Sequence, residues 1–252
     1  MLTYKYKLYK TRRTIWMDRM LRECAFVWNH ALAIQRRYYR LYGKYISTVD
    51  MQKHFAKRIK RNLLYSHNSI EVLQRLDAAY QRFFKKLAKR PPKFRRAAAF
   101  QSFAYKLHYG YKIDGNCFTI NRLKKTYKFH KSRNFSGNIK TVRIKRDPCG
   151  DFWLYVVTDA KVESSNMTHD GAVVGIDFGL KTYLTLSDGC TYENPQFFKQ
   201  MLRAIRKAHR RLSRSIKGSN NYRRRRLELD RLYRRISNSR DDYQWRLAHE
   251  LC

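Results

Sequence analysis

The chain has 252 residues, of which 56 are Lys or Arg and 19 are Asp or Glu, so that its formal net charge is +37 at pH 7. A compact body with this charge repels itself, and a polyanion is the expected partner because each phosphate contact neutralises a cation and releases counterions. Hydrophobic residues at 43% and aromatic residues at 15% exclude a disordered basic tail, and the composition therefore predicts a folded protein that binds nucleic acid.

The first predicted elements are a short strand and a long helix. Residues 3–9 alternate between apolar and polar side chains, which predicts a half-buried strand. From residue 14 to residue 42, apolar side chains recur at intervals of three and four, the spacing of one helix face. Gly43 stands where a glycine would end that helix.

Two further helices are predicted before residue 90. One covers residues 47–61. The next begins at Asn68, where Glu71 three residues later completes a capping-box pattern, and it runs to Lys89, ahead of two prolines. Residues 11–90 are therefore expected to form a small helical bundle with basic outer faces.

Short alternating strands replace the helical period after residue 94. Asp114-Gly115-Asn116 is a hairpin signal, and residues 139–146 and 152–158 predict a second pair of strands joined by a tight turn. Strands at this spacing suggest a small barrel, to which the first strand returns across the helices. The predicted barrel combines residues 1–10 and 91–165.

A polar linker, residues 161–170, precedes a second set of strands. The apolar run at 172–177 predicts a buried strand that ends in the carboxylate of Asp177. Residues 183–187 predict another strand, closed by an Asp188-Gly189 turn.

Two basic helices complete the sequence. Asn194-Pro195 predicts an N-cap followed by a proline at the first helical position, and Gly218 is expected to end this helix. A final helix runs from about Tyr222 to the end of the sequence. Because arginines crowd the joint between the two helices, we expect an antiparallel hairpin with basic flanks.

Asp177 is the candidate for chemistry. A carboxylate on a buried strand is costly unless it is paired or binds a metal, and in ribonuclease-H-like nucleases such a residue holds a pair of Mg²⁺ ions. Two other interpretations stay open: the carboxylate caps a glycine turn, or residues 175–179 resemble the phosphate-binding hairpin of actin- and heat-shock-type ATPases. One Asp cannot organise two Mg²⁺ ions, and the carboxylates after it lie in turns or on amphipathic helices.

The cysteines and the hydropathy exclude other classes of protein. The five cysteines are scattered without Cys-x-x-Cys pairs, so that neither a zinc site nor a disulfide framework is expected. No apolar stretch approaches the roughly 20 residues that span a bilayer, and the first residues do not form a signal peptide. We therefore expect no membrane partner and a reducing compartment that holds nucleic acid, the cytoplasm or nucleoid.

Eight segments, taken in order, resemble one known family. Two of them are Leu76-Asp77-Ala78-Ala79-Tyr80-Gln81-Arg82-Phe83-Phe84 and Gly175-Ile176-Asp177-Phe178-Gly179-Leu180-Lys181, and the others are residues 6–9, 24–32, 92–94, 101–103, 140–144 and 187–189. The sequence is similar to the TnpB (OrfB) proteins of insertion sequences, which are transposon-encoded RNA-guided nucleases related to type V CRISPR effectors. The segments cover nearly the whole chain in the order of the family.

The resemblance implies a multidomain α+β fold. A small, OB-like wedge barrel would be interrupted by a helical recognition lobe at residues 11–90, and residues 171–252 would form the first part of a ribonuclease-H/RuvC-like α/β nuclease domain with a basic helical hairpin. The implied partners are a guide RNA and a double-stranded DNA target, and the implied cofactor is Mg²⁺. Asp177 matches the first of three catalytic acids in the family.

One departure from the family pattern bears on catalysis. The sequence stops at Cys252, before the positions of the second acid, the third acid and the four-cysteine zinc ribbon. We therefore expect this truncated chain to bind no zinc and not to cut DNA. The alternatives are a fragment or decayed form of an enzyme, and a non-catalytic RNA-guided repressor or guide-RNA-binding module that functions at this length. A generic basic RNA-binding protein such as a ribosomal component would not need Asp177.

Clusters of basic residues are the predicted nucleic-acid contacts. They stand at helix starts, after the prolines and at the helical joint: Arg12, Arg13, Lys57, Arg58, Lys60, Arg61, Arg95, Arg96, Arg210, Arg211, Arg223, Arg224, Arg225 and Arg226. A single one of these charges fits a solvated surface as well as a phosphate contact, whereas a group points to a polyanion.

Overall fold

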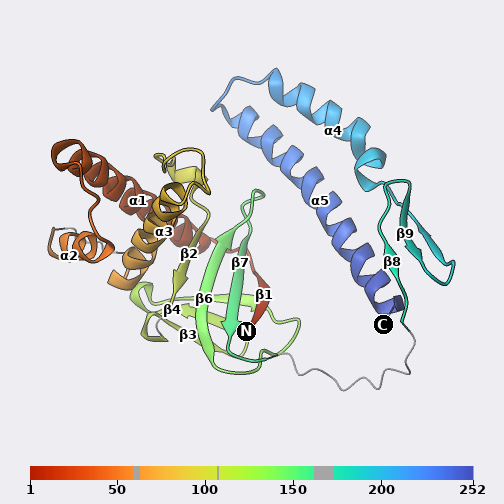
Figure 1. Cartoon of the computed structure of the whole chain (residues 1–252), viewed down its shortest axis with the longest axis horizontal. Helices are drawn as coiled ribbons and strands as arrows, with labels where there is room; N and C mark the ends of the chain where they lie inside the picture. The colour runs from red at the N-terminus through yellow and green to blue at the C-terminus, as the bar shows by residue number, and fades with distance from the viewer. Residues whose placement is uncertain (59–62, 107, 162–172, 252) are drawn as a thin grey trace. The chain divides into compact units, whose positions relative to one another are not determined.

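The computed structural model describes residues 1–58, 63–106, 108–161 and 173–251. The chain divides into two compact units, Met1–Val162 and Glu163–Cys252, and each is described by itself (Figure 1). The first combines a sheet with three α-helices, and the second combines a small sheet with a helical hairpin, so that the fold class is α+β as predicted.

A seven-stranded antiparallel sheet forms the barrel-like part of the first unit. Its spatial order is β2-β6-β7-β1-β5-β4-β3. The strands are β1 (Leu2–Leu8), β2 (Ser102–Tyr105), β3 (Tyr111–Asp114), β4 (Cys117–Ile120), β5 (Lys125–His130), β6 (Ile139–Arg146) and β7 (Phe152–Thr158). The two edges of the sheet approach each other, since the ring of Tyr105 in β2 lies 5.8 Å from that of Tyr111 in β3.

The predicted strand pairings of the barrel are confirmed. β1 lies between β7 and β5, so the first strand does return to the barrel across the helices. β6 and β7 pair as expected, and Gly115 adopts a left-handed φ of 55° in the β3–β4 hairpin, a conformation that favours glycine. Alternate residues of each strand point inward, and the barrel interior is largely aromatic: Tyr6, Tyr105, Tyr127, Phe103, Phe118 and Phe129 are all fully buried.

Three α-helices pack against this barrel and share one continuous core with it. They are α1 (Thr14–Tyr42), α2 (Thr48–Arg58) and α3 (Ser66–Phe84), and the short 3-10 turns of the unit are Ala97–Ala99, His108–Gly110 and Asn121–Leu123. α1 has the predicted bounds, and Gly43 ends it with a φ of 63°. One face of α1, centred on Trp28, is buried, as the helical period predicts.

The predicted limits of the third helix are wrong at both ends. The helix begins at Ser66 rather than at Asn68, and the Asn68 side chain accepts a hydrogen bond from the backbone of Tyr65 (N–Oδ1 3.2 Å). At the other end, Lys86 turns into the left-handed region with a φ of 58°, and the amide of Leu87 donates to the carbonyl of Arg82 (2.9 Å). This turn ends the helix before the prolines do.

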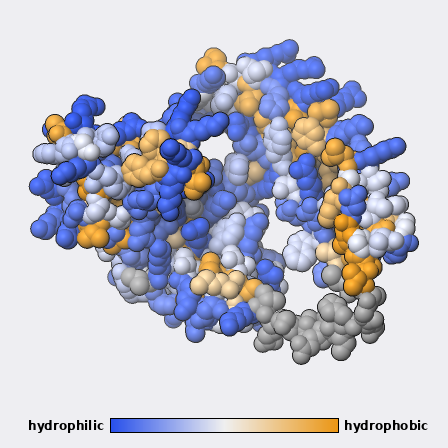
Figure 2. All heavy atoms as spheres, viewed as in Figure 1, coloured by the Kyte–Doolittle hydropathy of each residue, from blue (hydrophilic) through white to orange (hydrophobic). Residues whose placement is uncertain are grey.

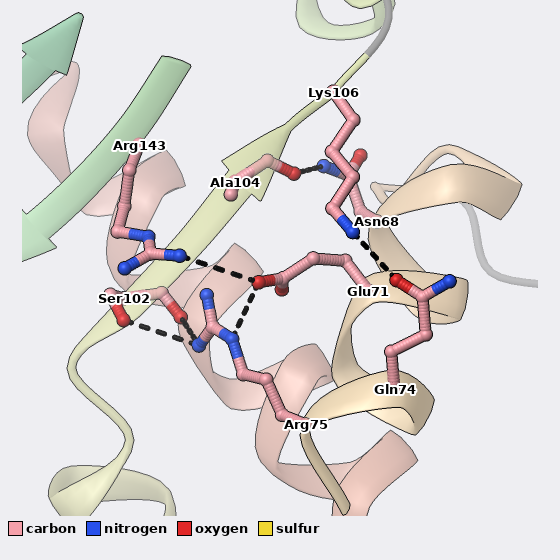
Figure 3. Close-up of polar contacts among 8 residues, drawn as sticks. All are labelled: Asn68, Glu71, Gln74, Arg75, Ser102, Ala104, Lys106 and Arg143. Atoms are coloured by element: carbon pink, nitrogen blue, oxygen red, sulfur yellow. Dashed lines mark hydrogen bonds and ion pairs between the residues drawn. The ribbon is translucent and has the colours of Figure 1, made fainter. Parts of the chain in front are cut away.

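Glu71, predicted to take part in the capping box, joins the helices to the barrel instead. Its Oε1 lies 2.6 Å from Nε of Arg75 and 4.0 Å from Nη2 of Arg143 in β6 (Figure 3). Arg75 also donates to the carbonyl of Ser102 in β2 (3.0 Å). Figure 3 shows the three charged side chains converging from α3 and the sheet. The carboxylate is almost fully buried, and these partners offset the cost of removing it from water.

The second unit is a three-stranded antiparallel sheet followed by two long helices. The strands, in the order β10-β9-β8, are β8 (Ile176–Asp177), β9 (Thr182–Leu186) and β10 (Thr191–Glu193). α4 (Phe197–Ser213) and α5 (Asn220–Leu251) form the predicted antiparallel hairpin and bury Ile205, Ala208, Leu212, Leu229 and Ile236 between them. The sheet contributes a smaller apolar cluster with Leu247 of α5.

Three local predictions in this unit are wrong. α4 ends at Ser213 rather than at Gly218. α4 begins at Phe197, two residues after the predicted start, because Asn194 Oδ1 accepts from the amide of Gln196 (3.0 Å) and shapes a turn before the helix. Of the predicted strand at 172–177, the described residues 173–177 form strand only at Ile176–Asp177, and both of these residues are exposed. Within the described residues β8 has a strand neighbour, β9, on one side alone, and this leaves the apolar run uncovered. Residue 172 itself and the predicted linker from residue 162 onward lie outside the described residues.

Candidate nucleic-acid interface

The first predicted basic pair lies where the chain leaves the barrel and enters α1. Arg12 and Arg13 are both exposed. The carbonyl of Arg13 accepts from the hydroxyl of Tyr127 (3.2 Å), and its guanidinium lies 3.5 Å from the carbonyl of Thr126. Because the backbone of Arg13 is held by β5, the two cations have a defined place beside the barrel.

The second predicted pair lies on a segment, residues 92–96, that α1 holds in place. The Trp28 ring nitrogen donates to the carbonyl of Lys93 (3.1 Å), and Arg36 donates to that of Pro92 (2.9 Å). Asn29 forms two hydrogen bonds with the backbone of Arg95, both 2.8 Å long.

The side chains of this pair differ. The Arg95 guanidinium stacks on the ring of Trp28, 4.1 Å from its centroid, and burial, with a smaller effect of Arg75, lowers the pKa of Arg95. Arg96 is exposed. Arg95 therefore has a structural partner, and Arg96 is the better candidate for contact with a phosphate.

The predicted cluster on the second helix is described only in part. Lys57 and Arg58 are exposed in the last turn of α2, where cations are favoured by the helix dipole. Lys60 and Arg61 lie outside the described residues.

Some of the predicted hairpin arginines already have acidic partners. Arg211 Nη1 lies 3.5 Å from Glu228 Oε1 across the hairpin, and Arg226 Nε lies 3.2 Å from Asp230 Oδ1 along α5. These two guanidinium groups are therefore already neutralised by carboxylates and are weaker candidates for phosphate contacts.

Arg225 has a structural role, and the remaining hairpin arginines face solvent. One nitrogen of Arg225 donates both to the carbonyl of Arg211 (2.7 Å) and to the hydroxyl of Ser215 (2.8 Å), which ties α5 to the end of α4. The exposed hairpin arginines of the predicted set that have no acidic partner among the described residues are Arg210, Arg223 and Arg224, of which Arg223 reaches only Asn220 (3.5 Å).

A row of cations on α4 extends this exposed group. The α4 ridge consists of Lys199, Arg203, Arg206, Lys207 and Arg210, all exposed on the side opposite the buried residues of the helix. None of the five is seen to pair with a carboxylate in the part of the chain that the structure describes. Figure 2 shows hydrophilic side chains projecting along this helix. Apart from Arg210, sequence reasoning missed the ridge, although its spacing of three and four residues is visible in the sequence.

A second basic surface that sequence reasoning missed lies on the barrel. We call it the outer barrel face and define it by Lys5 and Lys7 of β1, Lys145 of β6, and Trp153 and Tyr155 of β7. The cations are exposed and the rings are half-buried. The alternation within each strand predicts that these side chains lie on the outer face. That they lie next to one another follows only from the pairing of β1 with β7.

Asp177 is not on a buried strand, and this corrects the premise on which it was chosen. Its carboxylate is exposed, and its backbone pairs with Thr185 of β9. Among the described residues, no group of three or more His, Cys, Asp or Glu side chains is placed to hold a metal. The described residues therefore do not by themselves fit a Mg²⁺ site.

The cysteines and the helices carry little further information on function. Cys24, Cys117, Cys149 and Cys190 form no disulfide among the described residues, and burial raises the pKa of Cys24, which disfavours a reactive thiolate. Throughout the described ranges, every helix is too short or too polar to cross a lipid bilayer.

Comparison with known proteins gives three matches. A family model described as "Probable transposase" (OrfB_IS605) matches residues 155–252. A protein of Escherichia coli (strain K12), named "Putative RNA-guided DNA endonuclease InsQ", is 30% identical over 234 residues, which are 90% of this chain and 57% of that protein. A protein of Streptomyces pristinaespiralis, named "Putative RNA-guided DNA endonuclease", is 25% identical over 264 residues, which are 98% of this chain and 63% of that protein. The chain thus spans about six tenths of the length of these relatives.

Proposed function

We propose that this chain, as a member of the OrfB/TnpB family of transposon-encoded proteins, binds a guide RNA and, through base pairing by that RNA, a double-stranded DNA target. The observation that carries the proposal is the net charge of +37, together with exposed cations that have no acidic partner among the described residues. A polyanion is needed to offset such a charge.

The α4 ridge is the part of the structure that best fits a phosphate backbone. Lys199 and Arg210 stand eleven positions apart in the sequence, and at about 1.5 Å per residue the ridge is roughly 17 Å long. Cations in a straight row on one helix face can contact several consecutive phosphates. Such contacts hold a nucleic acid without reading its sequence, which agrees with a division of labour in which base pairing supplies the specificity.

The barrel, the three helices packed on it and the second unit suggest three separate tasks. We propose that the barrel, residues 1–10 and 91–165, is the wedge that supports the guide RNA, and that the helices within residues 11–90 are the lobe that recognises a short motif beside the target. Arg12, Arg13 and Arg96 lie exposed at the junctions between these parts. In this proposal, residues 171–252 form the first part of a RuvC-like domain, and its basic helical hairpin contacts nucleic acid.

DNA cleavage is a separate question from binding. The relatives are named endonucleases, and we propose Asp177 as the first acid of a Mg²⁺-dependent set of the family type. Its exposure makes the carboxylate accessible to ligands, but no group of three or more His, Cys, Asp or Glu side chains among the described residues is placed to hold a metal with it. Incubation of the chain with guide RNA, target DNA and Mg²⁺ tests this: cutting that Asp177→Ala abolishes supports a nuclease, whereas guided binding without cutting supports an RNA-guided repressor or guide-RNA-binding module.

The salt dependence of RNA binding tests the contribution of the ridge. We expect the logarithm of the affinity to fall steeply with the logarithm of the salt concentration, and Arg210→Gln to reduce the slope by about one unit. Arg226→Gln is the matched control, because Asp230 already neutralises that guanidinium, and its effect on the slope is expected to be smaller. A nearly flat plot for the unchanged chain, or equal effects of the two substitutions, would contradict the proposed role of the ridge.

A further inference from the structure

The outer barrel face alternates rings and cations in two neighbouring rows. In the sheet register, Trp153 of β7 stands between Lys7 of β1 and Lys145 of β6. In the next row, Tyr155 stands between Lys5 and Arg143. Each ring thus has a basic residue on both neighbouring strands.

These rings are not part of the barrel core. The neighbours of Trp153 along the strand, Phe152 and Leu154, are buried inside the barrel, as is Val156 on the far side of Tyr155. Because successive side chains of a strand point to opposite faces, Trp153 and Tyr155 lie on the outside, where they remain half-buried. Two aromatic residues in these positions are not needed to fill the barrel.

The ring of Trp153 is held in one orientation by its neighbours. Its indole nitrogen donates to Oδ2 of Asp147 (3.2 Å), and Nζ of Lys5 lies 4.5 Å from the ring centroid. Lys7 Nζ is 3.2 Å from Asp151 Oδ2 and 6.0 Å from the ring centroid. The indole is therefore oriented before any ligand binds. The Lys5 ammonium lies over its ring and would be displaced by a stacked base, whereas Lys7 is paired with Asp151.

The surface beside this ring is hollow. The depression is lined by Trp153, Lys5, Lys7, Tyr9, Lys10 and His130, and also by Asp151, whose carboxylate is paired with Lys7. Tyr9, which is 52% exposed, adds another ring at the end of β1. A flat aromatic group with an attached anion fits this combination of rings and cations better than an apolar ligand does.

We propose that the outer barrel face is a stacking platform for unpaired bases of single-stranded RNA, with Trp153 and Tyr155 stacking on bases and Lys5 and Lys145 contacting the phosphates between them. Stacking on an aromatic ring requires a base whose face is free, and a base within a duplex has both faces covered. The choice of RNA rests on the proposed function, in which the guide RNA is the partner with unpaired segments and the DNA target arrives as a duplex.

The test uses the full chain and three fluorescent oligonucleotides of equal length: an unstructured RNA strand, the same sequence as DNA, and an RNA duplex. Trp153→Ala is expected to weaken binding of the RNA strand by roughly 5- to 150-fold, the range for loss of one stacked base, and to leave duplex binding nearly unchanged. Trp153→Phe keeps a ring and is expected to retain most of the affinity. Trp245→Ala, which removes a 64% exposed ring from α5, is the matched control and is expected to have little effect on the RNA strand.

Several results would overturn the platform. The first is that Trp153→Ala binds the RNA strand with unchanged affinity. The others are that this variant loses affinity equally for the RNA strand and the RNA duplex, or loses affinity for the DNA strand alone. Thermal melting of each variant separates unfolding from loss of contact, and Tyr155→Ala supplies a second variant if Trp153→Ala fails to fold. The outcome is distinguishable from failure of the proposed function, because a chain that binds guide RNA without needing Trp153 disproves the platform alone.

Discussion

The two units of the chain distribute apolar and charged side chains in different ways. In the first, one core runs without interruption from the barrel through α1, α2 and α3. In the second, the described residues form two small clusters, one between α4 and α5 and one between the sheet and the end of α5. Apolar side chains of the second unit that no cluster covers include Val173, Phe178 and Leu180, which are 91%, 69% and 95% exposed.

This difference indicates what stabilises each unit. Burial of apolar surface is the main favourable term in folding, and the first unit has enough of it to hold its shape while carrying basic residues outside. The second unit buries little and carries the α4 ridge, the hairpin arginines and their mutual repulsion. We therefore expect its stability to depend more strongly on bound nucleic acid, which neutralises these charges.

The largest expected effect concerns the barrel core. Phe129 is fully buried, with its ring 5.2 Å from that of Tyr6, and Phe129→Ala is expected to lower the free energy of unfolding of the first unit by about 3–5 kcal/mol. Denaturation in urea, followed by circular dichroism, measures this. Tyr39→Ala, at a 63% exposed site on α1, should change it by less than about 0.5 kcal/mol. Similar losses for both variants would show that the barrel interior is not the source of stability.

A smaller effect is expected at the helical hairpin. Arg225→Ala removes the two hydrogen bonds to Arg211 and Ser215 and should lower the stability of the hairpin by about 1.5 kcal/mol. Faster hydrogen exchange of the α4 and α5 amides would report the loss. Arg224→Ala, at an exposed neighbouring site, is expected to leave exchange unchanged and to weaken RNA binding instead. If the two variants behaved alike, the separation of structural from nucleic-acid-binding arginines would be wrong.

The smallest effect concerns the pH dependence of the first unit. Burial lowers the pKa of His67, so the folded state binds a proton less readily than the unfolded state does. In the unfolded chain the pKa of a histidine is near 6.5, and above that pH the neutral His67 contributes fully to stability. As the pH falls from there toward the lower pKa of the folded state, this contribution is lost. Thermal melting between pH 7.5 and 5 should show this decrease, and His67→Gln should reduce it. His130→Gln, at an exposed site, should retain the full decrease; a smaller decrease in that variant would contradict the assignment.

Much of the fold could be predicted because its signals are local. The period of α1, the alternation in β6 and β7 and the turn glycines Gly43 and Gly115 each depend on neighbouring residues alone, and the structure confirms them. The limits of α3 could not be predicted in this way. Glu71 is held by Arg143 from a distant strand, and Lys86 adopts a left-handed conformation that its residue type does not favour.

The candidate site was predictable in kind but not in detail. Composition indicates a polyanion, yet only the structure separates Arg225, which ties the hairpin together, from Arg224, which faces solvent. The apolar run before Asp177 predicts a buried strand, but the structure leaves this strand exposed. An apolar run in the sequence does not reveal whether neighbouring elements cover it. The rings and cations of the outer barrel face come together only through the register of β1, β6 and β7.

The RNA that copurifies with the chain tests the central claim most directly. The protein would be isolated at moderate salt, and the bound nucleic acid would be extracted, quantified and sequenced. The account predicts a strong enrichment of one RNA species with an unpaired segment complementary to a DNA target. A folded protein free of nucleic acid, or a mixture of RNAs in proportion to their cellular abundance, would contradict it.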